Sequence, residues 1–354
     1  MGFTGINEQN KQRVNILPGA YSCIKQDVRD FNLKNVDTLI NKVLRYNERH
    51  SLTTEMHLKK YISSLSADLT DMGIGNELEM ITDAMYEREV QRIKKLNDSN
   101  PTHRRNQAGF YMRISNEVRR WLESDINTEN EYYLSLEQYI NAQIELYAHK
   151  SNYERESIIF DDIISQLNGY IKESTWLDVY YREPTTVHRI FPITVDSDRL
   201  NTHAYLACYR LVDRGKIVPI TYRITSLPAD IRPIEYDDAV ITDDMISRMS
   251  DFISERGIQF LAFEPVDIDV RLTSSGIKSY ERTLPLRPDC KKAVRHDDRE
   301  HPERSWAVYS FYCTEKQAEY YFLKFGKDAE ILSPDSLRNR FKAAYEETLH
   351  IYKD

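Results

Sequence analysis

The feature that most constrains this chain is a short alternating segment followed by two amphipathic segments, an order that occurs twice, about a hundred residues apart. In the first copy, polar and apolar side chains alternate over residues 13–16, and apolar residues then recur at helical spacing over 21–31 and 36–44. The second copy alternates over 110–115 and continues with helical stripes over 118–147. A period of two predicts a strand with one wet face, and a period of 3.6 predicts a helix with one buried face. The sequence therefore predicts strand, helix, helix, repeated once.

Such a repeat predicts a ribbon-helix-helix-like fold with both halves fused in one chain. In that fold the two strands pair into a ribbon whose inward side chains pack on the helices, while the outward side chains meet nucleic acid. The alternation assigns Arg13, Asn15, Tyr111 and Arg113 to the outward side. Two ordinary strands in a helical domain would show the same alternation, so both interpretations stay open at this point. Asp37 is the expected cap of the second helix in the first copy.

The length of 354 residues favours two or three domains over a single core. Residues 1–175 are predicted to form a helical domain that holds both strand-helix-helix motifs and a charged helical connector. Residues 176–262 contain short strands with polar turns, which are typical of a small barrel or sandwich. Residues 263–354 mix strands and helices, so the fold class is multidomain α+β. The charged segment 287–304 is predicted to be disordered.

The chain is acidic, and its formal net charge of -8 argues against a surface that binds polyanions everywhere. Its arginines are nevertheless concentrated in residues 100–121 and 181–225. No apolar stretch approaches the roughly 20 residues that a membrane span needs, so we expect a cytoplasmic protein without membrane contact. The four cysteines lie far apart, which predicts neither a disulfide framework nor a zinc site.

Sequence motifs for catalysis are absent. Gly73 and Gly75 lack the third glycine of a dinucleotide fingerprint, and neither a His-Glu-x-x-His nor a Gly-x-Ser-x-Gly motif occurs. His296, Asp297, Asp298 and His301 could bind a divalent metal. A solvated loop is favoured because no rigid element holds them in geometry. We therefore expect a protein that is not an enzyme and that uses no metal and no cofactor.

Basic and aromatic side chains interleave in a way that suits a nucleic-acid site, because guanidinium groups bind phosphates and aromatic planes stack on bases. Alternation places Tyr209 and Arg210 on opposite faces of a strand, and likewise Tyr222 and Arg223, so at most one set lines a common site. In a purely structural interpretation the same residues are ordinary strand positions. The predicted nucleic-acid-binding residues are Arg13, Asn15, Arg104, Arg105, Tyr111, Arg113, Arg182, His188, Arg189, Tyr205, Arg210 and Arg223.

Three segments of the middle region, RIFPITV, AYLACYR and TYRIT, resemble the core segments of WYL domains. The name-giving tripeptide appears as Ala204, Tyr205 and Leu206, so the tyrosine and the leucine match while the tryptophan is missing. Pro192 matches the proline of the preceding strand, and Arg223 matches the arginine of an Arg-Ile pair. The resemblance implies a small barrel of the Sm or SH3 type for this region.

The carboxyl-terminal segment YYFLKFGKDAEILSPDSLRNRF resembles the extension that follows WYL domains. With the amino-terminal repeat, the layout is similar to the WYL-domain accessory proteins of type VI-D CRISPR systems, and the resemblance covers most of the chain. It implies single-stranded RNA binding that boosts the RNA-guided nuclease, and homodimerisation through residues 263–354. It also implies a groove for a phosphate-bearing or anionic ligand flanked by Arg189, Arg210 and Arg223, of which only Arg223 occupies a motif position.

The resulting hypothesis is a non-enzymatic, homodimeric RNA-binding accessory protein that modulates a CRISPR RNA-guided RNA nuclease. One alternative is a transcriptional regulator whose ribbon reads duplex DNA while the WYL domain senses a small anionic ligand. Another alternative is a protein scaffold whose basic residues form only surface ion pairs. Three outcomes separate these hypotheses. RNA binding that weakens steeply with salt supports the accessory protein. A preference for a palindromic duplex supports the regulator, and neither behaviour supports the scaffold.

Overall fold

The structure is a computed structural model of the chain, and it forms two compact units, residues 1–161 and 162–354. The domain boundaries expected at residues 175 and 262 remain predictions. No helix in the part of the chain that the structure describes is long and apolar enough to cross a membrane. The described residues are 3, 11–56, 58–59, 62–63, 78–98, 108–124, 127–180, 187–212, 215–227, 231–236, 240–298, 301 and 305–352.

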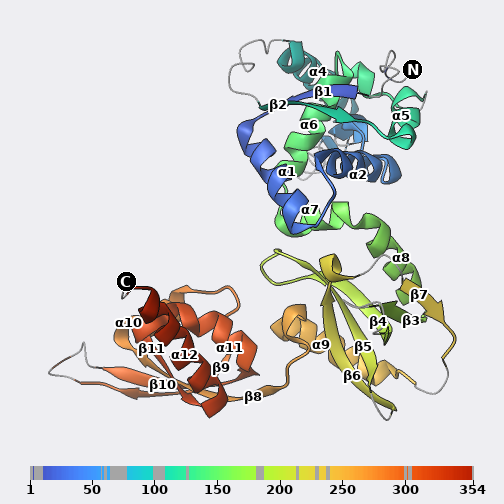
Figure 1. Ribbon diagram of the computed structural model, residues 1–354. Coiled ribbons are helices and arrows are strands. Elements are labelled where there is room, and N and C mark those ends of the chain that lie inside the picture. The colour runs from blue at the N-terminus through green and yellow to red at the C-terminus, as the bar shows by residue number, and fades with distance from the viewer. Residues whose placement is uncertain are drawn as a thin grey trace. The chain divides into compact units, whose positions relative to one another are not determined.

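In the first unit, β1 (Lys11–Ile16) and β2 (Ala108–Arg113) pair into an antiparallel ribbon (Figure 1). This pairing confirms that the two predicted strands meet, although about a hundred residues separate them in sequence. Val14 and Met112 are buried on the inward side, at 0% and 1% exposure. The alternation in the sequence therefore corresponds to one packed face and one wet face of the ribbon.

Each strand is followed by two helices, in the predicted order. Pro18 occupies the first turn of α1, where its fixed φ suits a helix start. Asn35 caps α2 by accepting the backbone N–H of Thr38 at 2.9 Å, so the prediction that Asp37 caps this helix is wrong. The helices of this unit are α1 (Pro18–Asp30), α2 (Val36–Arg49), α4 (Leu78–Asp98), α5 (Asn116–Glu123), α6 (Leu136–Ala148) and α7 (Asn152–Ile159).

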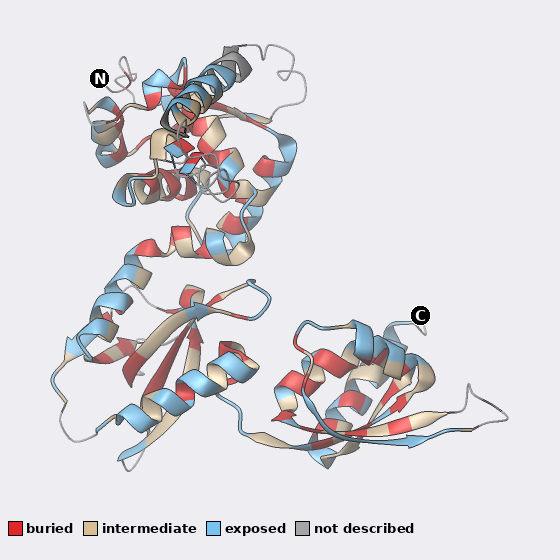
Figure 2. Ribbon diagram, turned by 180° about the vertical axis from the view of Figure 1, so that it is seen from behind, coloured by how far each residue is buried: buried red, intermediate tan, exposed pale blue. Residues whose placement is uncertain are grey.

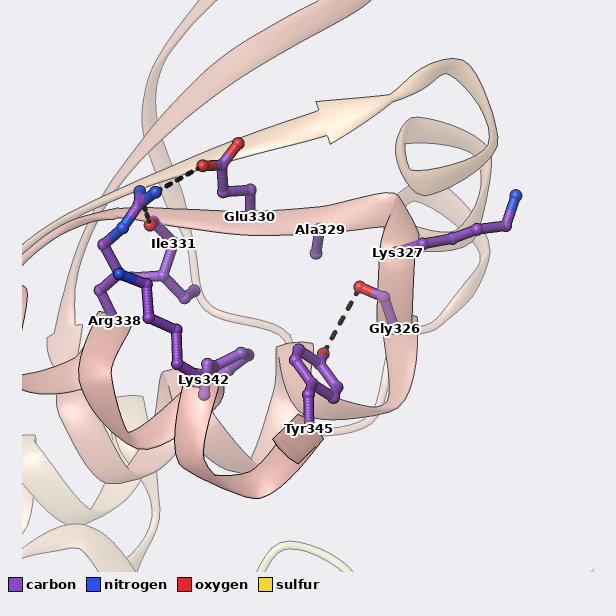
Figure 3. A pocket seen from close by; sticks show the side chains of 9 residues that line it. Gly326, Lys327, Ala329, Glu330, Ile331, Arg338, Lys342 and Tyr345 are labelled. Atoms are coloured by element: carbon purple, nitrogen blue, oxygen red, sulfur yellow. Dashed lines mark hydrogen bonds and ion pairs between the residues drawn. The ribbon is translucent and has the colours of Figure 1, made fainter. Parts of the chain in front are cut away.

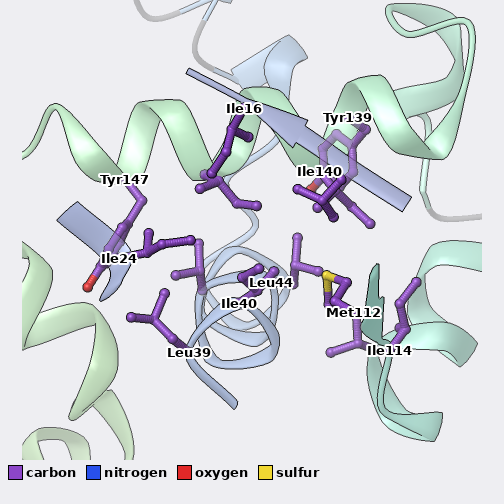
Figure 4. Packing of buried hydrophobic residues seen from close by; sticks show 14 of the residues in the cluster. Ile16, Ile24, Leu39, Ile40, Leu44, Met112, Ile114, Tyr139, Ile140 and Tyr147 are labelled. Carbon is purple, nitrogen blue, oxygen red and sulfur yellow. The ribbon is translucent and has the colours of Figure 1, made fainter. Parts of the chain in front are cut away.

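Apolar side chains from the ribbon, α1, α2 and α6 converge on one core (Figure 4). Leu39 and Ile40 of α2 and Ile140 of α6 are completely buried. Each side chain of this kind contributes about 1.5–3 kcal/mol when it leaves water. The helical stripes seen in the sequence are therefore the surfaces that hold the ribbon on the helices.

In the second unit, α8 (Asp161–Lys172) precedes a five-stranded antiparallel sheet with the order β6-β5-β4-β3-β7. Helix α9 (Asp243–Arg256) covers one face of this sheet, where Trp176 and Tyr209 belong to the same buried cluster as Met249. The strands are β3 (Trp176–Tyr180), β4 (Val187–Ser197), β5 (Ala204–Val212), β6 (Lys216–Arg223) and β7 (Ile231–Ile234).

The predicted Sm/SH3-like barrel is wrong, because β6 and β7 are the two edges of an open sheet and no described strand joins them. Pro219 in β6 and Pro233 in β7 explain part of this, since proline has no N–H for a further ladder bond and is typical of edge strands. The face that a closed barrel would bury against itself is buried against α9 instead. Strand alternation is the same in both arrangements, so the sequence did not separate them.

The remainder of the second unit is a four-stranded sheet of order β11-β8-β10-β9 with helices packed on it, which confirms the α+β class. Strand β9 lies exposed along its whole length at one edge (Figure 2), so the predicted disorder of residues 287–304 is wrong for Cys290–His296. The elements are β8 (Pro265–Thr273), α10 (Ser274–Arg282), β9 (Cys290–His296), β10 (Trp306–Thr314), α11 (Glu315–Phe322), β11 (Ala329–Ser333) and α12 (Asp335–Ile351).

Candidate nucleic-acid interface

The outward face of the ribbon carries three cations and one aromatic ring, which we call the ribbon patch: Lys11, Arg13, Tyr111 and Arg113. Arg13 lies directly opposite Tyr111 on the partner strand, and Lys11 lies opposite Arg113. Opposed residues on one face of an antiparallel pair have Cβ atoms about 5 Å apart, so the four side chains form one compact surface. All four are exposed, and 70% of Tyr111 is accessible to solvent.

None of the three cations of the ribbon patch forms an ion pair with a carboxylate in the described part of the chain. Arg119 of the neighbouring helix α5 differs in this respect, since it pairs with Glu123 at 3.0 Å. Positive charge that is not neutralised within the protein is available to an anionic ligand. Lys11 was not among the residues predicted to meet nucleic acid, although it has the same strand parity as Arg13 and this parity could have identified it.

On each outer side of the ribbon, an asparagine of the second helix in one repeat binds one backbone N–H. On β1, the N–H of Asn15 donates to Asn141 Oδ1 of α6 at 3.0 Å. On the β2 side, the N–H of Ser115 donates to Asn41 Oδ1 of α2 at 2.7 Å. Edge strands with free N–H groups pair readily with other chains, and these asparagines satisfy such groups internally. The ribbon is therefore completed within a single chain.

Asn15 was predicted to contact nucleic acid, but its side chain is hydrogen-bonded within the protein. Its side-chain amide donates to Glu137 of α6, and its Oδ1 lies above Gly109, where an added Cβ would come within 2.8 Å. The residue thus fastens the ribbon to α6, and Gly109 leaves room for it. Three other predicted residues, Arg104, Arg105 and Arg182, lie outside the described residues.

Arg189 of β4 is neutralised within its own sheet. Its Nε donates to Asp178 Oδ1 at 3.0 Å and its Nη2 donates to Asp178 Oδ2 at 3.3 Å, while the guanidinium lies 4.8 Å from the ring centroid of Tyr236. The hydrogen bonds to Asp178 raise the pKa of Arg189 further above its ordinary value. A guanidinium bound at both ends has little left to offer a phosphate.

Arg210 and His188 lie on the sheet face opposite to Arg189. Arg210 pairs across the ladder with Ile190, the strand neighbour of Arg189, and strand alternation puts adjacent residues on opposite faces. His188 Nδ1 is 2.8 Å from the hydroxyl of Tyr222. Burial, together with the positive charge of Arg210, lowers the pKa of His188 below 6.5. The imidazole is therefore neutral at pH 7 and adds no positive charge to a binding surface.

Arg223 ends β6 beside a cavity of about 270 Å³. It lies opposite Tyr205 in the ladder, and its Nη2 is 2.9 Å from His203 Nδ1. These three side chains line the cavity together with Gln259. Arg223 is exposed and forms no ion pair with a described carboxylate, so this WYL-like motif position presents a cation to a small concave site.

The predicted groove flanked by Arg189, Arg210 and Arg223 is wrong, because the three do not converge. Arg210 is on the other face of the sheet, and Arg189 is bound to Asp178. Arg189 and Arg223 share a face but lie about six residues apart along β5, or about 20 Å at 3.3 Å per residue. Among the described residues of the predicted set, Arg223 and Tyr205 share one site in this sheet, while His188 and Arg210 lie near each other on the opposite face.

A larger cavity, of about 470 Å³, lies between α12 and β11 (Figure 3). Arg338 is already engaged, since it binds Glu330 at 2.8 Å and the carbonyl of Ile331 at 2.7 Å, while Lys327 and Lys342 also line the cavity. The hydroxyl of Tyr345 donates to the carbonyls of Leu323 and Gly326 at 3.1 and 3.4 Å. The lining is mainly apolar, so the cavity is a weaker candidate for an anionic ligand than the ribbon patch, whose three cations lie on one exposed surface.

Comparisons with known proteins agree with this architecture. The family model of the WCX domain matches residues 264–349. The crystal structure of a CRISPR Cas-related protein matches with a TM-score of 0.71 and 22% sequence identity, over 97% of this chain and 94% of that chain. Proteasome accessory factor B/C (PafBC) of Arthrobacter aurescens matches with a TM-score of 0.30 and 13% identity, over 70% of this chain and 37% of that chain. This TM-score is too low to indicate a common fold. No curated protein matches in sequence. Residues 264–349 thus match the WCX domain family, and the chain shares the fold of a CRISPR Cas-related protein.

Proposed function

We propose that this protein is a non-enzymatic, CRISPR-associated accessory protein that binds single-stranded RNA through the ribbon patch. The observation that carries the proposal is the compact set of Lys11, Arg13 and Arg113 around the exposed ring of Tyr111, in a chain whose net charge is -8. Cations hold the phosphates of a single strand while an aromatic ring stacks on a base. The fold shared with a CRISPR Cas-related protein supports the CRISPR context.

The proposed complex is a homodimer that modulates an RNA-guided RNA nuclease. In this proposal the ribbon-helix-helix-like unit binds RNA and residues 263–354 supply the dimer contact. Arg223 and Tyr205 add a second, smaller anion site, because an exposed guanidinium beside a cavity is suited to one phosphate group. Binding RNA near the nuclease would raise the local concentration of its substrate.

A second candidate is a regulator that reads duplex DNA, and the antiparallel ribbon is the observation that favours it. Two-stranded ribbons enter the major groove in known DNA-binding proteins. Competition in one assay between a single-stranded RNA and a palindromic DNA duplex decides between the two candidates. Stronger retention of the RNA supports the first, and stronger retention of the duplex supports the second.

The central experiment removes the cations of the ribbon patch together. In the triple variant Lys11→Gln, Arg13→Gln and Arg113→Gln, fluorescence anisotropy with a labelled single-stranded RNA should show weaker binding at low salt. Each phosphate contact on a single strand contributes about 0.7 to the slope of log K against log salt. The magnitude of the slope should therefore fall by about 2 in the variant.

A matched control removes three exposed cations of the same unit that lie outside the ribbon, through Lys25→Gln, Arg29→Gln and Lys34→Gln. Both variants have the same net charge, so a difference between them isolates the position of the charge. Equal losses in the two variants, or RNA binding by the wild type that does not depend on salt, would refute the proposed role of the ribbon patch.

A further inference from the structure

The two halves of the first unit are related residue by residue at a spacing of one hundred. Asn41 of α2 and Asn141 of α6 close the two edges of the ribbon in the same way, and they bind the equivalent positions Ser115 and Asn15. Gln12 and Met112, which are also one hundred apart, face each other in the ladder. A pseudo-two-fold axis therefore passes through the ribbon at this pair, and features of one flank recur on the other.

Each flank of the ribbon carries a carboxylate at the same place. Asp37 and Glu137 are equivalent at this spacing, and both lie in the first turn of the helix that closes the edge. Asp37 Oδ2 accepts the N–H of Arg113 at 3.0 Å, and Glu137 Oε1 accepts the side-chain amide of Asn15. Both carboxylates are thus held against the strands and are not free to swing away.

Across the ribbon, the separation of these two carboxylates is close to the width of a major groove. The two strands are about 4.8 Å apart, and a hydrogen-bonded oxygen beyond each edge adds about 3 Å, so the carboxylates are separated by roughly 11 Å across the ribbon. They are also offset along the strands, because the residues they bind, Arg113 and Asn15, are four positions apart in the register, or about 13 Å. The major groove of duplex DNA is about 12 Å wide, with one phosphate backbone on each wall. A duplex seated on the ribbon would bring both of its backbones close to Asp37 and Glu137.

We infer that Asp37 and Glu137 are specificity determinants that prevent duplex DNA from binding to the ribbon patch, and this inference rests on the proposed function. Helix N-termini usually attract phosphate, but a carboxylate in the first turn of each flanking helix reverses that preference. A single strand has one backbone, which follows the cations in the middle of the ribbon and avoids the flanks. Duplex RNA is excluded separately, because its deep and narrow major groove does not admit such a ribbon.

The test is the double variant Asp37→Asn and Glu137→Gln, which removes both charges and keeps an oxygen that can accept the N–H of Arg113 and the amide of Asn15. Dissociation constants are measured for a single-stranded RNA and for a DNA duplex of the corresponding sequence, at fixed salt. A carboxylate and a phosphate about 4 Å apart repel enough to change affinity roughly fivefold even in water. With salt screening, the ratio of duplex to single-strand dissociation constants should fall about tenfold in the double variant.

The matched control is Asp30→Asn with Glu48→Gln, which removes two carboxylates at the far ends of α1 and α2. Glu48 is eleven residues beyond Asp37, or about 16 Å along the helix. The control should leave the ratio within about twofold of wild type. Each single variant, Asp37→Asn or Glu137→Gln, should shift the ratio about threefold. If one of the variants folds poorly, the other single variant still tests the inference.

The outcomes separate this inference from the proposed function. Wild-type binding to the single strand with a ratio unchanged in the double variant overturns the inference and leaves the proposed function standing. A wild-type preference for the duplex also overturns it. Failure of the wild type to bind either probe overturns both. An equal gain for both probes would show that the carboxylates act only through net charge, and this too would contradict the inference.

Discussion

Tyr111 is the residue on which the role of the ribbon patch can be tested most sharply. Its ring is 70% exposed at the centre of the outward face, opposite Arg13, and it contributes nothing to the buried core of the first unit. We predict that Tyr111→Ala weakens binding to single-stranded RNA, while Tyr111→Phe stays close to wild type. Stacking needs the aromatic plane and not the hydroxyl.

The expected magnitude follows from exposure and stacking. One base stacked on an aromatic side chain contributes about 1–3 kcal/mol, so Tyr111→Ala should raise the dissociation constant about 5- to 150-fold. The free energy of unfolding should change by less than about 0.5 kcal/mol, because the side chain is on the surface. Anisotropy titrations give the first quantity, and urea unfolding followed by circular dichroism gives the second.

Tyr352→Ala is the control for this prediction, since Tyr352 is 83% exposed and lies beyond α12 in the other unit. It should leave RNA affinity within about twofold of wild type. RNA binding by Tyr111→Ala as tight as that of wild type would refute stacking on Tyr111. An equal loss of affinity in Tyr111→Phe and Tyr111→Ala would refute it too, because the hydroxyl would then be the important group.

Two further predictions concern the five-stranded sheet. Arg189→Gln should leave RNA affinity unchanged, because Asp178 already neutralises the guanidinium. Arg223→Glu should weaken RNA binding in the same anisotropy assay. Unchanged binding by Arg223→Glu would instead favour a protein scaffold. The lowered pKa of His188 means that the unfolded chain binds a proton more readily than the folded one, so the stability that His188 contributes is present above about pH 6.5 and is lost as pH falls below it. Urea midpoints at pH 7.5 and 5.5 should show a larger drop for wild type than for His188→Gln, and equal drops would contradict this assignment.

Most of the ribbon could be predicted from the sequence because its information is local. The alternation around Arg13 and Arg113 fixed which side chains face outward, and the stripes around Ile40 and Ile140 fixed which helix faces are buried. The same local logic misplaced Asn15, because its outward position did not reveal the hydrogen bond to Glu137. That partner is more than a hundred residues away, and only the fold brings it near.

The five-stranded sheet illustrates what alternation does not encode. A barrel and an open sheet place the same residues on alternate faces, so the choice depended on α9 covering one face and on the prolines of the two edge strands. Likewise, three arginines at suitable spacing suggested a common groove. Strand register put Arg210 on the opposite face, and Asp178 neutralised Arg189.

By itself, the sequence determined the strand-helix-helix repeat, the mixed α+β class and the outward arginines of the ribbon, because side-chain periodicity reports directly on burial along one element. The tertiary structure decided which cations remain unpaired, which asparagines close the ribbon edges, and where Asp37 and Glu137 stand relative to the patch. These properties depend on contacts between residues far apart in the chain. Charge in a sequence is a sum over residues, but charge available to a ligand is what remains after the fold has paired them.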